Sequence, residues 1–227
     1  MCSEGSLYSA VAFCYGDEEE EKDIVYREES IQNQTKSYII DGSMKEVLEA
    51  VIMNEIIRAM EERRSIRKFK PDMPAKQDLE QIIEAGLYAA NGMGQQATIT
   101  IAVTNKELRD ELSEINRKIG GWDEGFDPFY GALAILLVLA NKERPTCIYD
   151  GSLVMGNMML AAHTLGLGSI WIHRAKEEFE MPEYKQLLKK LGIEGEWEGI
   201  AHCAVGYADG ELSQAADRKE GRVFWIE

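Results

Sequence analysis

The sequence is poor in the residues that would place it in several specialised classes of protein. It has four cysteines, five prolines and three histidines in 227 residues. Cys2, Cys14, Cys147 and Cys203 form no Cys-x-x-Cys pair and no even framework, which excludes a disulfide scaffold and fits a reducing cytoplasm. The longest apolar run, Ala132 to Ala140, is less than half of the roughly 20 residues that a membrane-spanning helix needs. No signal peptide is evident, so we expect a cytoplasmic protein with no membrane partner.

Positive charge is also scarce. There are 40 acidic and 25 basic residues, a net charge of −15, whereas nucleic acids and anionic membranes require a positive field. We therefore expect no nucleic-acid partner. Residues 1–52 carry 12 of the acidic and 4 of the basic residues, including the five consecutive acids of Asp17–Glu21. We interpret residues 1–52 as an acidic N-terminal extension of unknown role, and residues 53–227 as the main domain.

The boundary itself allows two interpretations. Met53 is a candidate alternative translation start, which would make the extension dispensable. Ser43 and Glu46 match a capping box, however, and this pattern favours a helix that begins before Met53 and continues across it.

Helical and strand-like patterns alternate along the main domain. The spacing of apolar residues predicts helices over residues 43–62, 74–90, 107–119, 149–165 and 182–191. The fourth is apolar nearly all round and is expected to be buried. Strands are predicted at Ile99–Val103, Leu133–Leu139, Ser169–Ile172, Ile200–Val205 and Val223–Ile226, and two short ones in the extension at Asp23–Tyr26 and Ser37–Ile40. This pattern predicts an α+β sandwich of one sheet with helices around it.

The most distinctive local feature is a cluster of five cations within residues 63–70, just where the first helix is expected to end. Arg63 and Arg67 are four residues apart and point the same way if the helical turn continues. Arginine forks suit the bidentate capture of phosphate, and Ser65 adds a hydroxyl group. The same cations also complement a helix C-terminus, so charge alone leaves both interpretations open.

Three further segments have polar or glycine-rich patterns that suit a ligand. They are the loop Ala89–Gln96, the turn and strand Gly166–Arg174, and the pair Arg218-Lys219. Each also has an ordinary interpretation, as a helix C-cap, a helix-to-strand turn and solvent-facing bases.

The spacing of the histidines and cysteines indicates neither a metal site nor a catalytic nucleophile. No spacing of histidine, cysteine and acid suggests a metal site. We expect His163 and His202 to be core histidines, and Cys147 to be a buried thiol.

In their order and placement, the four segments resemble the FMN-dependent nitroreductase family. RRSIRKF after the first helix is its most recognisable string. FYGALAILLVLA (129–140) and DGSLVMGNMMLAAHTLGLGSIWI (150–172) are similar to its central strand, long helix and following strand. The resemblance begins near Met53 and runs to the C-terminus. It implies a three-layer sandwich with a mainly antiparallel sheet, in an intertwined homodimer with FMN at the interface.

The resemblance also implies which residues contact the cofactor. Those implied to hold the phosphate, ribityl chain and pyrimidine edge of FMN are Arg63, Arg64, Ser65 and Arg67, with Arg218 on the phosphate. Those implied to reach the flavin from the partner subunit are Asn91, Gly92 and Met93. Those implied to lie beside the isoalloxazine ring, where a main-chain N–H meets N5, are Ile172, His173 and Arg174.

Three departures from the family pattern make this chain particular. Gly94, Gln96, Ala97 and Thr98 stand where the family often has Asn and Gln-Pro-Trp. Ala216-Asp217-Arg218 replaces Lys-Pro-Arg, so one phosphate cation is missing. His173 and Arg174 replace smaller residues beside the ring, which narrows the pocket or adds an anion contact.

The implied activity is that of an NAD(P)H-dependent FMN oxidoreductase. NADH or NADPH gives a hydride to the flavin, and two electrons then pass to a nitroaromatic, a quinone or a similar small acceptor. Reductive dehalogenases and flavin-destroying enzymes of the same fold are alternatives. So is a non-catalytic FMN-binding sensor or store. A phosphate-binding α+β protein without flavin is the remaining alternative.

Overall fold

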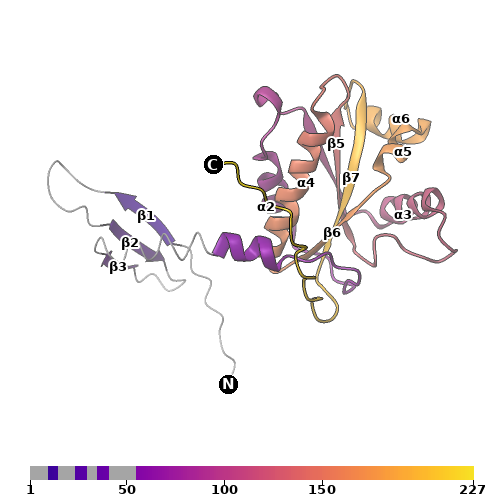
Figure 1. Ribbon diagram of the computed structural model, residues 1–227. Coiled ribbons are helices and arrows are strands. Elements are labelled where there is room, and N and C mark those ends of the chain that lie inside the picture. The colour runs from indigo at the N-terminus through magenta and orange to yellow at the C-terminus, as the bar shows by residue number, and fades with distance from the viewer. Residues whose placement is uncertain (1–9, 15–23, 30–34, 41–54) are drawn as a thin grey trace. The chain divides into compact units, whose positions relative to one another are not determined.

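The structure is a computed structural model that describes residues 10–14, 24–29, 35–40 and 55–227 (Figure 1). The chain divides into two compact units, Met1–Arg58 and Ala59–Glu227. The predictions for the acidic run 17–21, the capping box 43–46 and the boundary at Met53 lie outside the described residues.

The first unit contains a three-stranded antiparallel sheet in the order β1-β2-β3. Its strands are β1 (Ala10–Cys14), β2 (Ile24–Glu29) and β3 (Thr35–Ile40). Both strands predicted in the extension are present and are longer than expected. β1 falls in an apolar stretch that we did not assign to a strand. The third strand adds backbone hydrogen bonds that an isolated two-stranded hairpin lacks.

The second unit is built on a four-stranded antiparallel sheet in the order β4-β5-β7-β6. The strands are β4 (Thr98–Val103), β5 (Ala134–Asn141), β6 (Gly168–Ile172) and β7 (Trp197–Gly206). β5 is buried along Ala134–Ala140, because it is a central strand with both faces covered. β4 and β6 are the edge strands, and β6 carries part of the sequence that resembles nitroreductases.

Helices cover both faces of this sheet (Figure 1). α2 (Lys76–Leu87) and α4 (Cys147–Thr164) pack on one face, whereas α3 (Lys106–Gly120), α5 (Ala175–Glu180) and α6 (Pro182–Lys190) lie on the other. Two apolar clusters fill the layers, one around Ile82 and Met155 and the other around Leu112 and Phe179. The predicted three-layer α+β sandwich is confirmed.

Local signals explain where several helices begin. The side chain of Asn105 accepts a hydrogen bond from the N–H of Leu108 at 2.9 Å and so caps α3. Pro182 occupies the first turn of α6, where its missing N–H has no cost. The short helix α5 has no comparable signal and was not predicted.

Two predictions about the second unit are wrong. Val223–Ile226 is not a strand, because no strand of the described chain pairs with it; its side chains are 72–101% exposed. α4 is not buried all round, because the sheet and α2 cover only one side of it. Tyr149 is 70% exposed and Leu153 is half exposed on the other side. Within the described residues, no helix combines the length and apolar character that crossing a membrane requires.

Candidate functional site

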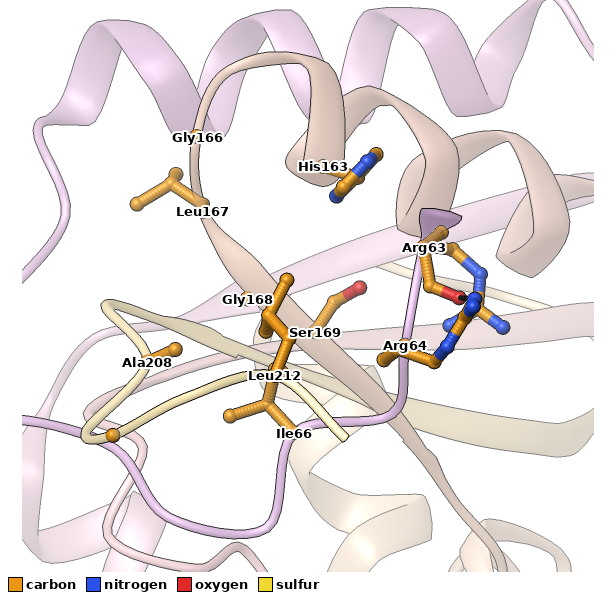
Figure 2. A pocket seen from close by; sticks show the side chains of 11 residues that line it. Arg63, Arg64, Ile66, His163, Gly166, Leu167, Gly168, Ser169, Ala208 and Leu212 are labelled. Carbon is orange, nitrogen blue, oxygen red and sulfur yellow. Dashed lines mark hydrogen bonds between the residues drawn. The ribbon is translucent and has the colours of Figure 1, made fainter. Parts of the chain in front are cut away.

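A cavity of about 240 Å³ lies where the segment after the first helix meets the α4–β6 turn and the chain beyond β7 (Figure 2). Its lining residues are Arg63, Arg64, Ile66, His163, Gly166, Leu167, Gly168, Ser169, Ala208, Gly210 and Leu212. Three segments far apart in the sequence therefore form one site. Two of them, the cation cluster of residues 63–70 and the turn and strand Gly166–Arg174, were already candidates from the sequence.

Backbone hydrogen bonds hold residues 63–70, the arginine segment, beside β6. The helix at residues 55–62 ends there, and the N–H of Ile66 donates to the carbonyl of Ser169 at 3.1 Å. Ser65 forms a parallel bridge with Ser169, and the N–H of Lys70 donates to the carbonyl of Tyr207 at 2.9 Å. Since the segment is not helical, the condition under which Arg63 and Arg67 would share a helical face is not met.

Arg63 and Arg67 instead line two adjoining cavities. Arg63 is half-buried in the first, whereas Arg67 is exposed and lines a second cavity of about 270 Å³ together with Ser65 and Lys68. The charge of Lys68 is balanced by Asp209, whose carboxylate lies 2.6 Å from the Lys68 ammonium group. The two cavities share part of their lining, so the four predicted residues of the arginine segment do lie together.

The donors in the first cavity are incompletely used. Arg63 Nη1 and Arg64 Nε are both buried and meet no hydrogen-bond acceptor in the described part of the chain. Arg64 Nη1 donates to the carbonyl of Arg63 at 2.8 Å and to that of Glu61. No carboxylate from residues 55–227 lines this cavity. Because an orphaned buried donor is costly, this arrangement suits an anionic ligand with several acceptor oxygens, such as a phosphate group.

The glycine-rich turn allows β6 to approach the arginine segment closely. A Cβ at Gly168 would lie 2.6 Å from Cγ1 of Ile66, so a side chain there would push the two segments apart. Gly166 has a φ of 74°, in the left-handed region that favours glycine. The ordinary interpretation of this segment as a helix-to-strand turn is thus correct, and the same turn also forms one wall of the cavity.

The histidines separate into two kinds. His202 is a core histidine, as predicted: it is fully buried, with Nε2 2.8 Å from Oε2 of the buried Glu178. His163 is not, because α4 ends beside the cavity and leaves the imidazole half-buried in its wall (Figure 2). The described residues include no group of three or more histidines, cysteines and acids that could hold a metal ion.

The two cysteines of this unit are both free thiols. Cys147 is half-buried at the start of α4, so the prediction of a buried thiol is wrong. Cys203 lies in the sheet, where burial raises the pKa of its thiol to about 12 and keeps it protonated.

Ile172, His173 and Arg174 lie at the other end of β6. Ile172 is buried, whereas His173 and Arg174 line a cavity of about 640 Å³. β6 spans five residues, so the two ends of the strand are about 13 Å apart. In the described chain this strand pairs only with β7 along its full length, and its outer edge is open beyond Ser169. The arginine segment lies at one end of β6, and His173 and Arg174 lie at the other, so all of them lie along the same edge of the sheet.

The loop with Asn91, Gly92 and Met93 lies elsewhere. The N–H of Gly92 donates to Oδ1 of Asp150 at 3.0 Å, which fixes this loop near the start of α4. His163 is at the end of the same helix, about 20 Å farther along the axis. The fold does not bring this loop to the arginine cavity of its own chain. Asp150 was missed by sequence reasoning, although an acid in the first turn of an otherwise apolar helix is a usable signal.

Arg218 is also apart from the cavities. Its guanidinium is exposed and donates to the carbonyl of Ala216, two residues earlier, at 3.1 Å from Nε. It lines neither the cavity of Arg63 nor that of Arg67.

These features define a class of protein: an antiparallel α+β sandwich with an arginine-lined cavity beside an edge strand. The sequence matches the Nitroreductase family over residues 60–120 and 122–207, so the chain belongs to that family.

Relatives and solved structures agree with this assignment. A nitroreductase with bound FMN from Bacteroides fragilis is 27% identical, has a TM-score of 0.70, and matches 77% of this chain and 100% of its own. A protein of Archaeoglobus fulgidus named as an NADH dehydrogenase or NAD(P)H nitroreductase is 28% identical over 173 residues, which are 73% of this chain and 94% of that protein. An FMN reductase [NAD(P)H] of Bacillus subtilis is 27% identical over 170 residues, covering 62% and 66% of the two chains.

Proposed function

We propose that this protein is an FMN-dependent oxidoreductase that takes electrons from NADH or NADPH and passes two of them to a small acceptor, such as a nitroaromatic or a quinone. The observation that carries the proposal is that Arg63 and Arg64 line a cavity at one end of the edge strand β6, and that each has a buried donor without an acceptor among the described residues. FMN has a phosphate at one end and a flat ring at the other. An open strand edge with a cationic cavity at one end and a larger cavity at the other suits such a molecule.

The phosphate end of the site is assigned to the arginine segment. Arg63 and Arg64 would bind the phosphate through charge-assisted hydrogen bonds, which are roughly twice as strong as neutral ones. Ser65 and Arg67, in the adjoining cavity, would hold the ribityl chain and the pyrimidine edge. A cation at that edge stabilises the negative charge that develops on a reduced flavin.

The ring end is assigned to the main chain at Ile172, His173 and Arg174. When bound, FMN would supply the hydride and electron transfer, which no amino-acid side chain can perform. The protein's part is to bind and orient the ring with main-chain N–H groups at the strand end, and to keep water from it. We assign no side chain as a general acid. The bound FMN of the Bacteroides fragilis nitroreductase supports this cofactor.

We also propose that two copies of the chain form a homodimer. Large apolar side chains remain uncovered on the described chain: Met93 is 87% exposed and Trp225 84% exposed, and Tyr149 and Leu153 form an uncovered face of α4. A second copy would cover these groups. It would also explain the loop of Asn91, which cannot reach the arginine cavity of its own chain and would contribute to the partner's site instead.

Residues 1–52 are proposed to be an extension outside the FMN-binding domain. The family match begins at residue 60, and the compact unit that contains the cavities begins at Ala59. A chain that starts at Met53 is therefore expected to keep its FMN affinity and its dimer.

The visible absorption spectrum of the purified protein tests the cofactor assignment. We expect a yellow protein with about one FMN per chain after reconstitution. A colourless protein that takes up no FMN would contradict the proposal, and would leave Arg63 and Arg64 as a site for some other phosphate compound.

A further inference from the structure

Arg174 stands at the corner between β6 and α5 in a backbone conformation that arginine rarely adopts. Its φ is 80°, in the left-handed region, which is disfavoured for residues that carry a Cβ. Such a conformation persists only where the surroundings fix it, and these positions concentrate at functional sites.

A buried polar network holds the corner. Nδ2 of Asn116 donates to the carbonyl of His173 at 2.7 Å and to Oε1 of Glu178 at 2.8 Å. The other oxygen of Glu178 lies 2.8 Å from Nε2 of His202. Asn116, Glu178 and His202 are all fully buried, so the corner is tied to the core from three elements. Its side chains are therefore presented in a fixed arrangement.

The guanidinium of Arg174 is placed on an aromatic ring. It lies 4.3 Å from the centre of the Trp122 ring, which comes from the turn after α3. Stacking holds the plane of the guanidinium and leaves its N–H edge available to a ligand. No carboxylate of the described residues forms an ion pair with it.

The cavity beside Arg174 combines an aromatic wall with this cation. Trp171 and His173 line it with their rings 5.7 Å apart, and the Trp171 indole N–H donates to Nδ1 of His173 at 3.2 Å. This bond leaves Nε2 of a neutral His173 as a second donor. The other cation of the cavity, Lys176, is paired with Glu198 at 3.0 Å. Glu177 also lines the cavity and is exposed.

We propose that the part of this cavity left open by the flavin ring binds the electron acceptor, and that the Arg174 side chain makes the enzyme prefer aromatic acceptors with an anionic group such as a carboxylate. The inference rests on the proposed function and names the substrate class of that site. A flat ring would lie against Trp171 and His173 while its carboxylate meets the guanidinium edge. For 4-nitrobenzoate the balanced reaction consumes NADH and one proton and yields 4-nitrosobenzoate, water and NAD⁺. Two electrons and two protons convert the nitro group to the nitroso group, and one N–O bond is broken.

The test compares two acceptors of nearly equal size, 4-nitrobenzoate and the neutral 4-nitrobenzyl alcohol. Their dissociation constants are measured by calorimetry on the oxidised, FMN-loaded protein without NADH, and their kcat/KM values are measured separately. We expect the wild type to favour 4-nitrobenzoate by about tenfold or more in both, because an arginine–carboxylate pair is a strong charge-assisted contact. Arg174→Gln should reduce this ratio to within about twofold.

Two further variants keep the test decisive. Trp122→Leu leaves Arg174 in place and removes the stack, so the ratio should fall by about threefold. Lys106→Gln is the matched control, since it also removes one positive charge but lies at the opposite end of α3, and its ratio should equal that of the wild type. Thermal melting of each variant shows whether it is folded.

Several results would overturn the inference. One is equal affinity of the wild type for the two acceptors, and another is an unchanged ratio in both Arg174→Gln and Trp122→Leu. If Arg174→Gln alters the preference for NADPH over NADH and leaves the acceptor ratio intact, Arg174 binds the phosphate of the donor, and the acceptor assignment is wrong. FMN content and reduction by NADH are recorded on the same samples, and their absence in the wild type would contradict the proposed function instead.

Discussion

The backbone N–H of Gly92 donates a hydrogen bond of 3.0 Å to Oδ1 of Asp150, across 58 residues of sequence. Oδ2 of the same carboxylate accepts from the hydroxyl of Thr146 at 2.9 Å, and Asp150 is buried. The carboxylate lies in the first turn of α4, where the helix dipole favours a negative charge. Asp150 thus fixes the position of the loop that we propose reaches the partner's flavin.

Replacement of Asp150 by alanine should weaken both folding and FMN binding. The half-buried N–H of Gly92 would lose a hydrogen bond to a charged acceptor, and such a bond contributes about 1.5–3 kcal/mol to the free energy of unfolding. Urea denaturation measures this loss, and fluorescence titration measures the expected fall in FMN affinity. Glu107→Ala, an exposed acid in the first turn of α3, is the control. Wild-type stability in Asp150→Ala would show that the bond is not needed to hold the loop.

Gly92 is predicted to tolerate a side chain only if Thr146 becomes smaller. A Cβ at Gly92 would lie 2.4 Å from Oγ1 of Thr146, so Gly92→Ala should destabilise the protein by about 1–3 kcal/mol. In the Gly92→Ala/Thr146→Ala double variant, much of that loss should be recovered. The double-mutant cycle measured by urea denaturation gives the coupling between the two sites. Additive losses would mean that the clash is relieved elsewhere.

Substitutions of the three arginines in the arginine segment should weaken FMN binding to different degrees. Arg63→Ala and Arg64→Ala each remove buried donors, and hydrogen bonds to charged groups contribute about 1.5–3 kcal/mol. The dissociation constant of FMN should therefore rise by roughly 10- to 150-fold. Arg67→Ala should have a smaller effect, because Arg67 is exposed. Lys76→Gln on α2 is a control for loss of charge. Unchanged FMN affinity in all three arginine variants would remove this segment from the site.

Much of the fold could be predicted from the sequence because its signals are local. The four sheet strands and the longer helices follow from apolar spacing, and Asn105 and Pro182 mark helix starts through groups within one turn. The arginine segment and the two ends of β6 could be placed in the site because a motif links them.

What could not be predicted depends on partners distant in the sequence. Asp150 gains its role from Gly92, and Arg174 from Trp122. His163 was expected in the core because its neighbours on α4 are apolar, yet only the tertiary fold decides which turn of a helix faces a cavity. Val223–Ile226 has the composition of a strand, but composition cannot supply the neighbour that a strand requires.

A fall in pH should destabilise the folded protein, partly because the Asp127 carboxylate becomes protonated. Burial raises the pKa of this carboxyl, but hydrogen bonds from Arg109 and Ser113 outweigh burial and lower it below its usual value. A carboxyl whose pKa is lower in the folded state stabilises that state above its unfolded pKa, and the contribution is lost as the pH falls through the folded pKa. The free energy of unfolding of the wild type should therefore fall between about pH 5 and pH 2.

Asp127→Asn tests this assignment. The variant should be less stable than the wild type at neutral pH, and its stability should depend less on pH in the acid range. Asp78→Asn, a half-buried acid in the first turn of α2, should follow the wild-type curve. Parallel curves for Asp127→Asn and the wild type would assign the acid sensitivity to other groups.

The proposed dimer predicts a role for the exposed C-terminal tail. Phe224 and Trp225 are both 84% exposed in the described chain. If the partner covers them, the double variant Phe224→Ser/Trp225→Ser should dissociate at protein concentrations at which the wild type remains dimeric, as measured by sedimentation velocity. Arg222→Ser, in the same tail, controls for an effect of substitution alone. A dimer of unchanged stability would exclude the tail from the interface.

The central claim is that the cavities along β6 hold a flavin that NADH or NADPH reduces. Anaerobic mixing of the FMN-loaded protein with each nicotinamide in a stopped-flow instrument tests it most directly. We expect the visible flavin absorption to bleach within the turnover time of the enzyme, and to return when a nitroaromatic acceptor is added. A bound flavin that neither nicotinamide bleaches would contradict the assignment of an NAD(P)H-dependent oxidoreductase and favour a flavin-binding sensor or store.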